Sequence, residues 1–286
     1  MKGREALGRL RKTLDDGGVI IGSGAGTGMS AKLAEAGGVD LIIIYNSGRY
    51  RMAGRGSLSG LLPYGDANAV VLDMAGEVLP VVKDTPVLAG VCGTDPFRIM
   101  DKFLDTVADT GFAGVQNFPT VGLIDGNFRR SLEETGMSFS LEVDMIESAV
   151  AKGLLTAPYV FDVEQAEAMA GVGADMVVVH VGLTVSGTIG AQTARTMDES
   201  IDMVQRLADA ARSVKEDIVV LFHGGPIADP EHVRHVLERT TGTHGFFGAS
   251  SVERLPVETA MTERVRQFKA IPGPEAAPEP EREALT

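Results

Sequence analysis

IVVLFHGGP at residues 218–226 and GFFGASS at residues 245–251 carry the pattern that decides the fold. Each is a short apolar run that ends in glycines or small residues and leads into a helical pattern. A glycine turn between a strand and a helix lets backbone N–H groups approach an anion, and the helix N-terminus adds positive potential. In a (β/α)8 barrel the loops after strands 7 and 8 commonly bind phosphate. The predicted anion-binding positions are Gly224, Gly225, Gly248, Ala249 and Ser250.

The rest of the chain repeats this alternation of a β-type run and a helical pattern. The expected strands are 19–22, 41–45, 87–91, 114–117, 154–159, 176–181, 218–222 and 245–248. The expected helices are 4–15, 30–36, 68–81, 96–110, 140–152, 163–172, 197–214, 230–239 and 256–269. Eight consecutive strand–helix units require a parallel sheet and favour its closure. The prediction is an α/β fold, a single (β/α)8 TIM barrel with a short N-terminal helix.

Length and composition fit one barrel domain at residues 1–270. The chain has 286 residues, of which 44% are hydrophobic, enough for a large core. Residues 271–286 are rich in Pro and Glu, and we expect a disordered tail there.

Net charge and cysteine content indicate which binding partners and which cellular compartment to expect. A net charge of −13 would be repelled by nucleic acid and by anionic membrane surfaces, so neither is expected as a partner. No apolar run reaches the ~18 residues of a membrane span. A single cysteine allows no intrachain disulfide, and we expect a cytoplasmic protein.

Three aspartates at expected helix starts are interpreted as helix caps. Asp95 and Asp229 precede prolines, and Asp162 precedes the helical pattern at 163–172. An aspartate before the first turn accepts a hydrogen bond from a free backbone N–H, and proline suits the first helical position. Capping explains these acids better than metal binding does.

Polar residues gather where the expected strands end, at one mouth of the barrel. Arginine presents a planar fork that suits a carboxylate or phosphate, and several arginines lie in these loops although the protein is acidic. This pattern indicates a small anionic substrate, with pairing to surface acids as the alternative for some of the arginines. The candidate substrate-binding residues are Ser23, Gly24, Asn46, Ser47, Arg49, Arg51, Asn117 and Arg129, besides the glycine turns named above.

Four residues are candidate catalytic groups. His180 and His223 end neighbouring strands, and imidazole is the commonest general acid–base group near neutral pH. Cys92 ends the third strand and is either a nucleophile or a small packing residue. Glu142 either reaches back to the mouth or stabilises the first turn of its helix.

Several familiar site types are missing from the sequence. No lysine ends an expected strand, which argues against a Schiff-base aldolase. No paired acids end a strand either, so a carboxylate pair or a dedicated cage for a divalent metal has little support. The glycine-rich loop at 22–28 fails the spacing of a dinucleotide-binding fingerprint.

Four motifs together resemble one known family. They are AGTGMSAK at 25–32, YNSGRYR at 45–51, QNFPTVG at 116–122 and HGGP at 223–226. They resemble the phosphoenolpyruvate hydrolase-like TIM-barrel family, within the wider phosphoenolpyruvate/pyruvate-binding barrel group, over about residues 4–270. The resemblance implies a homo-oligomer. It also implies Mg²⁺ as a cofactor, although the acid pattern that holds the ion in that group is missing here, so the metal stays unknown.

Three functions fit these features. The first is an enzyme that acts on a small anionic oxo-acid or enol phosphate, by hydrolysis or by C–C or C–O lysis through an enolate. In such an enzyme, backbone N–H groups and arginines would stabilise the negative charge of the enolate. His180 or His223 would transfer the proton. The second is a non-catalytic barrel that binds a metabolite or a protein, because fold alone does not fix function. The third is a phosphosugar isomerase or synthase.

Overall fold

One parallel sheet of nine short strands forms the centre of the molecule. The computed structural model describes residues 2–273. The sheet order is β5-β4-β3-β2-β1-β9-β8-β7-β6. The strands are β1 (Ile20–Gly24), β2 (Leu41–Ile44), β3 (Val87–Val91), β4 (Gly114–Asn117), β5 (Leu155–Thr156), β6 (Tyr159–Val160), β7 (Met176–Gly182), β8 (Val219–Gly224) and β9 (Gly245–Gly248). The described strands are almost entirely buried, as expected where helices cover the outside of a parallel sheet.

The sheet closes into a barrel through a strand that is broken in the middle. The strand expected at 154–159 is two pieces, β5 paired with β4 and β6 paired with β7. Ala157 N donates to Val115 O at 3.0 Å on one side, and Pro158 O accepts from Val178 N at 2.8 Å on the other. Because proline has no N–H to donate, Pro158 interrupts the strand and the pairing switches sides there. The predicted eight-stranded (β/α)8 TIM barrel is confirmed.

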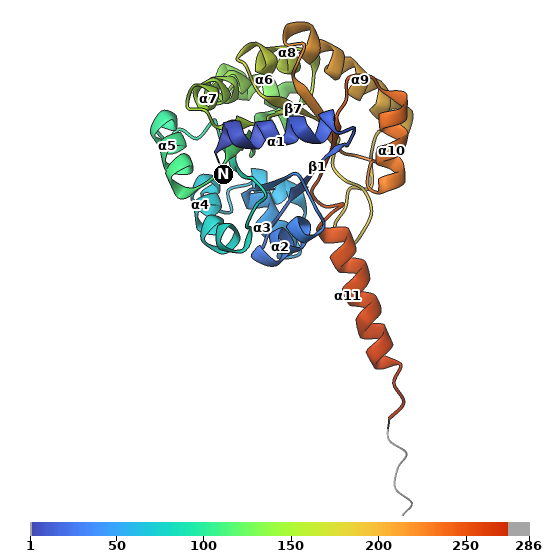
Figure 1. Ribbon diagram of the computed structural model, residues 1–286. Coiled ribbons are helices and arrows are strands. Elements are labelled where there is room, and N and C mark those ends of the chain that lie inside the picture. The colour runs from blue at the N-terminus through green and yellow to red at the C-terminus, as the bar shows by residue number, and fades with distance from the viewer. Residues whose placement is uncertain (1, 274–286) are drawn as a thin grey trace, which may run out of the picture.

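Helices surround the sheet, and Figure 1 shows them as an outer ring. They are α1 (Gly3–Asp15), α2 (Gly28–Ala36), α3 (Asn46–Met52), α4 (Ala67–Val78), α5 (Met100–Thr110), α6 (Gly126–Glu134), α7 (Phe139–Ala151), α8 (Val163–Gly171), α9 (Met197–Val214), α10 (Pro230–Arg239) and α11 (Arg254–Lys269). The short N-terminal helix α1 lies across the end at which the strands begin, with Ala6, Leu7 and Leu10 buried. The opposite end, where the strands finish, is the end at which (β/α)8 barrels bind ligands.

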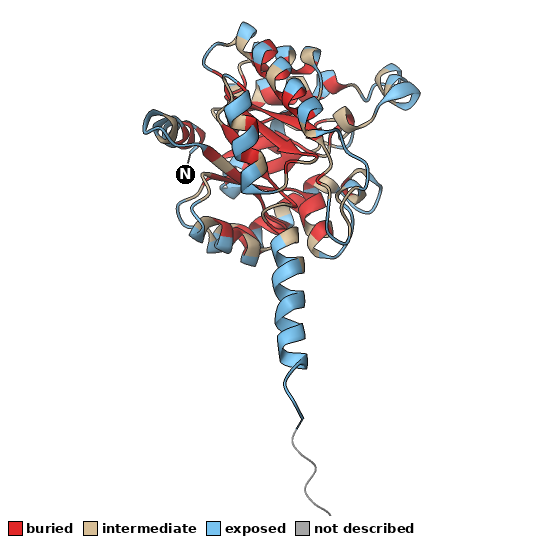
Figure 2. Ribbon diagram, turned by 90° about the vertical axis from the view of Figure 1, so that its right-hand side faces the viewer, coloured by how far each residue is buried: buried red, intermediate tan, exposed pale blue. Residues whose placement is uncertain are grey.

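The last helix departs from the ring. In Figures 1 and 2, α11 leaves the barrel after β9 and extends away from it. Figure 2 shows its length as exposed, in contrast to the buried inner faces of the other helices. The tail predicted to follow it lies mostly outside the described residues, which end at residue 273.

Several boundaries differ from those the sequence predicted. The helix expected at 96–110 begins at Met100, and Asp95 does not cap it: the Asp95 carboxylate instead accepts hydrogen bonds from Asn68 Nδ2 and Phe97 N. The capping roles of Asp162 and Asp229 are confirmed, since each accepts a backbone N–H of its helix. The loops at 46–52 and 126–134 contain the unpredicted helices α3 and α6, whose glycines and polar residues masked the helical pattern. No helix of the described residues is long and apolar enough to cross a membrane.

Gly114 tests the tight contact at the closure. A Cβ at Gly114 would lie 1.9 Å from the Leu155 carbonyl oxygen, where β4 meets β5. Gly114→Ala should therefore lower the free energy of unfolding in urea by about 1–3 kcal/mol, since a packed core resists added volume. Gly8→Ala on α1 is the control: a Cβ there has no neighbour within 4 Å, and it should be neutral or stabilising by up to about 1 kcal/mol. Equal stabilities for the two variants would contradict the closure described.

Candidate active site

A small polar hollow opens at the carboxyl ends of the strands, the catalytic face of this fold. Its volume is about 50 Å³. The residues that line it are Tyr45, Ser47, Arg51, Ser57, Leu58, Phe118, Leu123, Tyr159, His180, Leu183, Thr184, Ile189, Ala191, His223, Ala249, Ser250 and Arg254. They come from strands on opposite sides of the barrel and from the loop at 183–191. We call this set the central hollow.

The two predicted histidines meet in the central hollow with complementary hydrogen bonding. His180 and His223 lie opposite each other in the register of β7 and β8, with ring centroids 4.7 Å apart. His223 Nδ1 lies 2.7 Å from the Phe247 carbonyl oxygen, which can only accept, so this nitrogen carries the proton. His180 Nδ1 accepts a hydrogen bond from Gly182 N at 3.2 Å, so in the neutral ring the proton sits on Nε2. The contacts thus assign an unprotonated Nε2 to His223 and an Nε2–H to His180.

Both imidazoles are neutral at pH 7. Burial lowers the pKa of His223 to about 4. Burial and the neighbouring His223 hold the pKa of His180 well below its ordinary value of 6.5. Desolvation and the neighbouring imidazole both disfavour the protonated, cationic form of each ring. The pair therefore offers one basic nitrogen and one neutral N–H donor.

Aromatic side chains form the floor beneath the histidines. Tyr159 is fully buried at the centre, and its ring centroid lies 4.9 Å from that of His180 and 5.4 Å from that of His223. Burial raises the pKa of its hydroxyl well above 10. The guanidinium of Arg51 lies 5.9 Å from the centroid of the Tyr45 ring, and a Cβ at Gly24 would lie only 2.9 Å from the Tyr45 hydroxyl. Gly24 thus leaves the room that Tyr45 needs, and we find no direct contact between Gly24 and the hollow.

A buried ion pair forms one wall. Glu253 Oε2 accepts hydrogen bonds from Arg51 Nε at 3.0 Å and Nη2 at 2.5 Å, and both side chains are at most 2% exposed. Glu253 Oε1 accepts from Gly26 N at 2.6 Å. The next residue, Arg254, lines the hollow. Its guanidinium donates to Ser186 O at 3.0 Å and to Glu258 Oε1 at 3.1 Å. Each arginine of this wall therefore has an acid as partner, and Arg254 keeps further N–H donors for a ligand.

Ser47 supplies a polar atom without a partner. Its hydroxyl oxygen is buried and forms no hydrogen bond with any described residue, although it lines the hollow. Asn46 holds the loop in place, because its side chain donates to Gly60 O at 2.9 Å and accepts from Ser47 N at 2.8 Å. A buried hydroxyl left unpaired costs free energy unless a ligand or water completes it. The Ser47 hydroxyl is thus available to a ligand or a water in the hollow.

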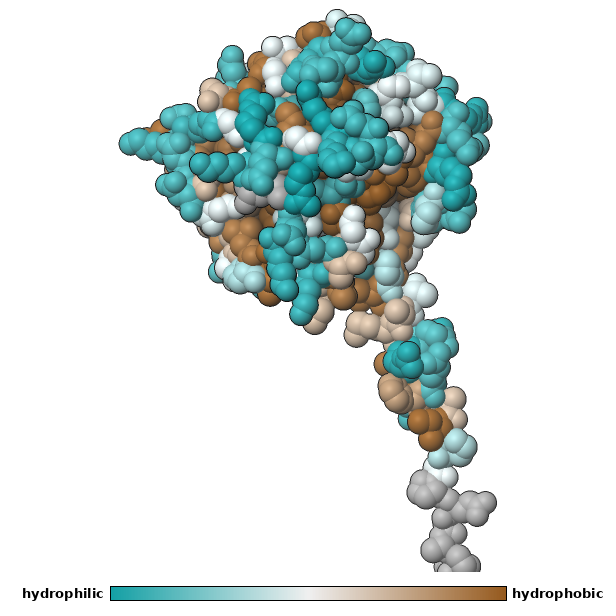
Figure 3. Space-filling model, viewed as in Figure 1, coloured by the Kyte–Doolittle hydropathy of each residue, from teal (hydrophilic) through white to brown (hydrophobic). Residues whose placement is uncertain are grey.

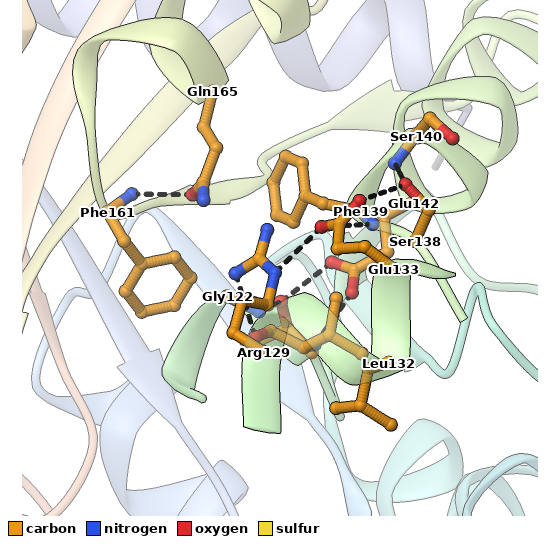
Figure 4. Close-up of polar contacts among 12 residues, drawn as sticks. Gly122, Arg129, Leu132, Glu133, Ser138, Phe139, Ser140, Glu142, Phe161 and Gln165 are labelled. Atoms are coloured by element: carbon orange, nitrogen blue, oxygen red, sulfur yellow. Dashed lines mark hydrogen bonds and ion pairs between the residues drawn. The ribbon is translucent and has the colours of Figure 1, made fainter. Parts of the chain in front are cut away.

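Glu142 anchors the loop after β4. It accepts hydrogen bonds from Asn117 Nδ2 at 2.6 Å, Thr120 Oγ1 at 2.7 Å and Val121 N at 2.8 Å. Asn117 in turn accepts from Tyr159 N at 2.6 Å and so fixes β6. Figure 4 shows Glu142 close to Arg129 and Glu133 at this turn. Glu142 does not line the central hollow, and its bonds position Phe118 and Tyr159, which do.

Burial outweighs these hydrogen bonds in setting the charge of Glu142. Desolvation raises its pKa to about 7, and the bonds from Thr120, Val121 and Asn117 offset only part of that effect. A buried carboxyl with a raised pKa holds its proton in the folded state at pH values where the unfolded chain has lost it.

Other predicted residues lie outside the central hollow. Arg49 pairs with Asp73 at the surface, and Arg129 pairs with Glu133 and donates to Val121 O. Cys92 contacts Thr94, and burial raises the pKa of its thiol, which disfavours the thiolate. The remaining residues outside it are Ser23, which is buried, and Gly224, Gly225 and Gly248 in the turns after β8 and β9. Of the predicted anion positions, Ala249 and Ser250 line the hollow.

One backbone N–H of the predicted anion site is used within the protein. Gly224 and Gly225 have positive φ angles of 85° and 59°, and Gly225 N donates to Gly182 O at 2.8 Å. This N–H is used to tie β8 to β7 rather than to face the hollow.

Sequence reasoning missed Glu253 and Arg254. Both fall at the start of a helix, where an exposed charged residue is ordinary. One signal was available: a basic residue in the first turn of a helix opposes the helix dipole, so Arg254 needs another reason to be there. Its bonds to the 183–191 loop supply that reason.

The described residues do not fit a divalent metal. Among them no group of three or more His, Cys, Asp or Glu side chains could hold an ion. Glu253 and Glu142, whose partners line the hollow, already accept hydrogen bonds, Glu253 from Arg51 and Gly26 and Glu142 from the loop after β4. Mg²⁺ prefers carboxylate oxygens in octahedral geometry, and the histidine nitrogens are poor substitutes. We therefore derive no step through a metal.

Comparison with known proteins assigns the family. The model of the phosphoenolpyruvate hydrolase-like family matches residues 5–271. The chain belongs to this family. It is 63% identical over 265 residues to the ToMV susceptible protein tm-1(GCR26) of Solanum lycopersicum, covering 93% of this chain and 35% of that protein. It is 34% identical to a putative transcriptional regulatory protein, y4pA, of Sinorhizobium fredii, covering 94% of this chain and 43% of that protein. This family member thus spans less than half the length of these relatives.

Solved structures share the fold at low sequence identity. A phosphoenolpyruvate phosphomutase from Streptomyces platensis subsp. rosaceus aligns with a TM-score of 0.59 at 19% identity, covering 92% of this chain and 87% of that one. A phosphonopyruvate hydrolase complexed with oxalate and Mg²⁺ aligns with a TM-score of 0.58 at 17% identity, covering 96% and 92%. An oxaloacetate acetylhydrolase aligns with a TM-score of 0.60 at 16% identity, covering 96% and 90%. At these identities the likeness concerns the barrel itself.

Glu142 gives a pH-dependent test of the anchor. Because its folded pKa of about 7 lies above the ordinary value of 4.5 for this side chain, the free energy of unfolding should fall as pH rises from about 4.5 to about 7. Glu142→Gln removes this titration. Relative to that variant, the wild type should lose on the order of 3 kcal/mol over this window in urea unfolding.

Glu147→Gln, an exposed change on the same helix, is the control and should keep the wild-type slope. The two histidines titrate in all three proteins and cancel in the comparison. Parallel pH profiles for wild type and Glu142→Gln would show that Glu142 is charged throughout.

Proposed function

We propose that this chain is an enzyme that cleaves a small oxo-acid or related hydroxy acid through an enolate. In this proposal His223 is the general base and His180 is a neutral hydrogen-bond donor. The observation that carries the proposal is the complementary pair of hydrogen bonds that leaves a bare Nε2 on His223 and an Nε2–H on His180 in one hollow.

The reaction follows from these two atoms. The reacting carbon, C2, carries a hydroxyl, from a 2-hydroxy acid or from hydration of a 2-oxo acid, and C4 of the same substrate is a carbonyl or carboxyl carbon. His223 Nε2 takes the hydroxyl proton, the O–H electron pair forms a carbonyl, and the adjacent C–C bond breaks. The electron pair of that bond remains on the departing fragment as an enolate, whose oxygen accepts from His180 Nε2–H. Protonated His223 then returns the proton to the enolate carbon.

A pKa of about 4 makes His223 a weak base in the empty hollow. An anionic substrate beside the ring favours the imidazolium and raises that pKa toward neutrality. Binding of the correct substrate would therefore prepare the base, and the aromatic floor of Tyr159 would keep water out of the reacting centre.

The charges of the hollow favour a carboxylate as the anchoring group. Arg51 is balanced by Glu253 and Arg254 by Glu258, so little net positive charge is left for a phosphate dianion. The free donors of Arg254 and the unpartnered hydroxyl of Ser47 match a carboxylate.

A non-catalytic barrel is the second candidate. Two relatives carry names of a virus susceptibility protein and of a putative transcriptional regulator, neither of which names an enzyme. In that case the hollow would bind a small acid without turning it over, and the domain would report its presence.

His223 separates these two functions. His223→Gln should lower turnover of oxaloacetate or an acyl-pyruvate by at least about 100-fold, the usual contribution of a general base, while binding of oxalate persists. Products would be followed by proton NMR. The control is His235→Gln, an exposed change on α10, which should leave turnover intact. Oxalate binding without turnover of any acid in the wild type would favour the non-catalytic barrel.

Ser47 tests the ligand position. Ser47→Ala removes an unpaired buried hydroxyl, so without ligand the free energy of unfolding should stay equal or rise slightly. In the wild type, oxalate at about 100 times its Kd should add about 2.7 kcal/mol of stability, measured as a thermal shift, and Ser47→Ala should reduce that shift.

Ser140→Ala, exposed at the start of α7, is the matched control and should keep the full shift. A full shift in Ser47→Ala would remove this residue from the site.

A further inference from the structure

A second cavity adjoins the central hollow at the carboxyl ends of the strands. Its volume is about 520 Å³, and we call it the side cavity. Among the residues that line it are Leu123, Arg129, Phe161, His180, Gly182 and Arg195. Leu123 and His180 also line the central hollow. Figure 3 views the barrel from the opposite end, where hydrophilic side chains of α1 lie across it, so both spaces belong to the catalytic face.

His180 forms the boundary between the two spaces. Its ring centroid lies 4.7 Å from that of His223, which lines the central hollow, and 5.1 Å from that of Phe161, which lines the side cavity. The pairing of β7 with β8 shifts register between His180 and Gly182, and a bulge of this kind redirects a side chain next to a site. Because Gly182 N donates to His180 Nδ1, the Nε2–H group is left for a ligand at this boundary.

The aromatic wall of the side cavity is fixed by its neighbours. Phe161 N donates to Gln165 Oε1 at 3.0 Å, as Figure 4 shows. A Cβ at Gly122 would lie 2.3 Å from the Phe161 ring, so the ring lies against this turn only because the residue is glycine. The side cavity is therefore a defined part of the catalytic face.

Two arginines give the side cavity hydrogen-bond donors that the protein leaves unused. Arg129 donates from Nε to Glu133 at 2.7 Å and from Nη1 to Val121 O at 3.0 Å, which leaves the N–H groups of Nη2. Figure 4 shows the Arg129 guanidinium between Glu133 and Phe161. Arg195 forms no hydrogen bond or ion pair with any residue in the described range 2–273. Two guanidinium groups with open N–H positions in one cavity suit a carboxylate.

The acids of the side cavity are bonded or exposed. Glu133 accepts from Arg129 Nε. Asp162 caps α8, and its two oxygens accept from Gln165 N and Gln165 Nε2 at 2.8 Å each. Asp125 is exposed, so water weakens the field of its charge. The bonding capacity that remains unused inside the cavity is therefore that of the arginines, and an anion would complete it.

The side cavity lies where the proposed reaction places the far part of the substrate. In that reaction the C4 oxygen accepts from His180 Nε2–H, and the C1 carboxylate lies with Ser47 and Arg254 in the central hollow. C4 is then at the boundary between the two spaces. A chain attached to C4 has the side cavity beside it, and a carboxylate at the end of that chain meets Arg129 and Arg195.

We propose that the substrate is a 2,4-dioxo acid whose C4 carries a chain ending in a second carboxylate, and that the side cavity binds this chain. The inference rests on the proposed function and names its substrate class. One water adds to C2, the C2–C3 bond breaks, and C3 takes the proton from His223. The products are oxalate, whose new carboxyl group releases a proton, and a methyl ketone that keeps the second carboxylate.

A matched pair of substrates tests this class. The first is 2,4-dioxoheptanedioate, and the second is its 7-carboxamide, which has nearly the same shape and one negative charge fewer. The wild type should have a kcat/KM for the diacid about 10- to 100-fold above that for the amide, the range for a hydrogen bond to a charged group. Formation of the methyl ketone would be followed by proton NMR. Equal values for the two compounds, or a preference for the amide, overturn the proposal.

Arg195→Gln removes one of the two cations. Because Arg195 has no bond within the described residues, the variant should keep the wild-type midpoint of thermal unfolding. Its preference for the diacid should fall about tenfold, mainly through a higher KM, since the lost contact is remote from the reacting atoms. Arg206→Gln, an exposed change on α9 outside the side cavity, removes the same charge and should keep the full preference. An unchanged preference in Arg195→Gln contradicts the assignment.

Binding separates this inference from the reaction on which it rests. Both compounds would be titrated calorimetrically into His223→Gln, with and without Arg195→Gln. An Arg195-dependent preference for the diacid in binding, with no turnover by the wild type, overturns the reaction and leaves the side cavity as a carboxylate site. Turnover of oxaloacetate by the wild type, with no preference for the diacid in rate or in binding, overturns the side cavity and leaves the reaction. Neither turnover nor binding would overturn both.

Discussion

The buried pair of Arg51 and Glu253 is the interaction on which the site depends. It joins the loop after β2 to the turn after β9, and Glu253 also accepts from the loop after β1 through Gly26 N. Two charges taken out of water cost several kcal/mol each unless their geometry and hydrogen bonds compensate. Here every oxygen of Glu253 is bonded, so the pair fixes three loops in one arrangement. That arrangement places Tyr45, aims Arg254 at the hollow and sets the direction of α11.

The electrostatics of the central hollow follow from this pairing. Its arginines are matched by acids and its imidazoles are neutral because they are buried. A site of this kind discriminates by the position of donors and acceptors more than by total charge. In a low-dielectric setting a single well-placed N–H or bare nitrogen has a large effect on a developing charge. The small volume and the aromatic floor strengthen that effect by limiting water.

Strand and cap patterns were strong enough to predict the barrel, and the exceptions have local causes. Continuous apolar runs such as Leu41–Ile44 could only be buried parallel strands, and Asp162 and Asp229 cap their helices as expected. Pro158 split one strand because it lacks an N–H. Asp95 accepts hydrogen bonds from Asn68 Nδ2 and Phe97 N and does not cap the helix predicted at 96–110. Short helices such as α6, which is mostly polar and buries no residue, have the composition of a surface loop and were predicted as loops.

The sequence alone determined the fold, the family and the presence of two histidines at neighbouring strand ends, because these follow from local periodicity and motif spacing. Tertiary structure decided which candidates meet. Arg49 and Arg129, which were predicted to bind substrate, pair with acids outside the hollow. Arg254, which was not predicted, lines it. The tautomers of His180 and His223 depend on Gly182 N and Phe247 O. Such choices depend on contacts between residues distant in the chain and on burial, which no local pattern encodes.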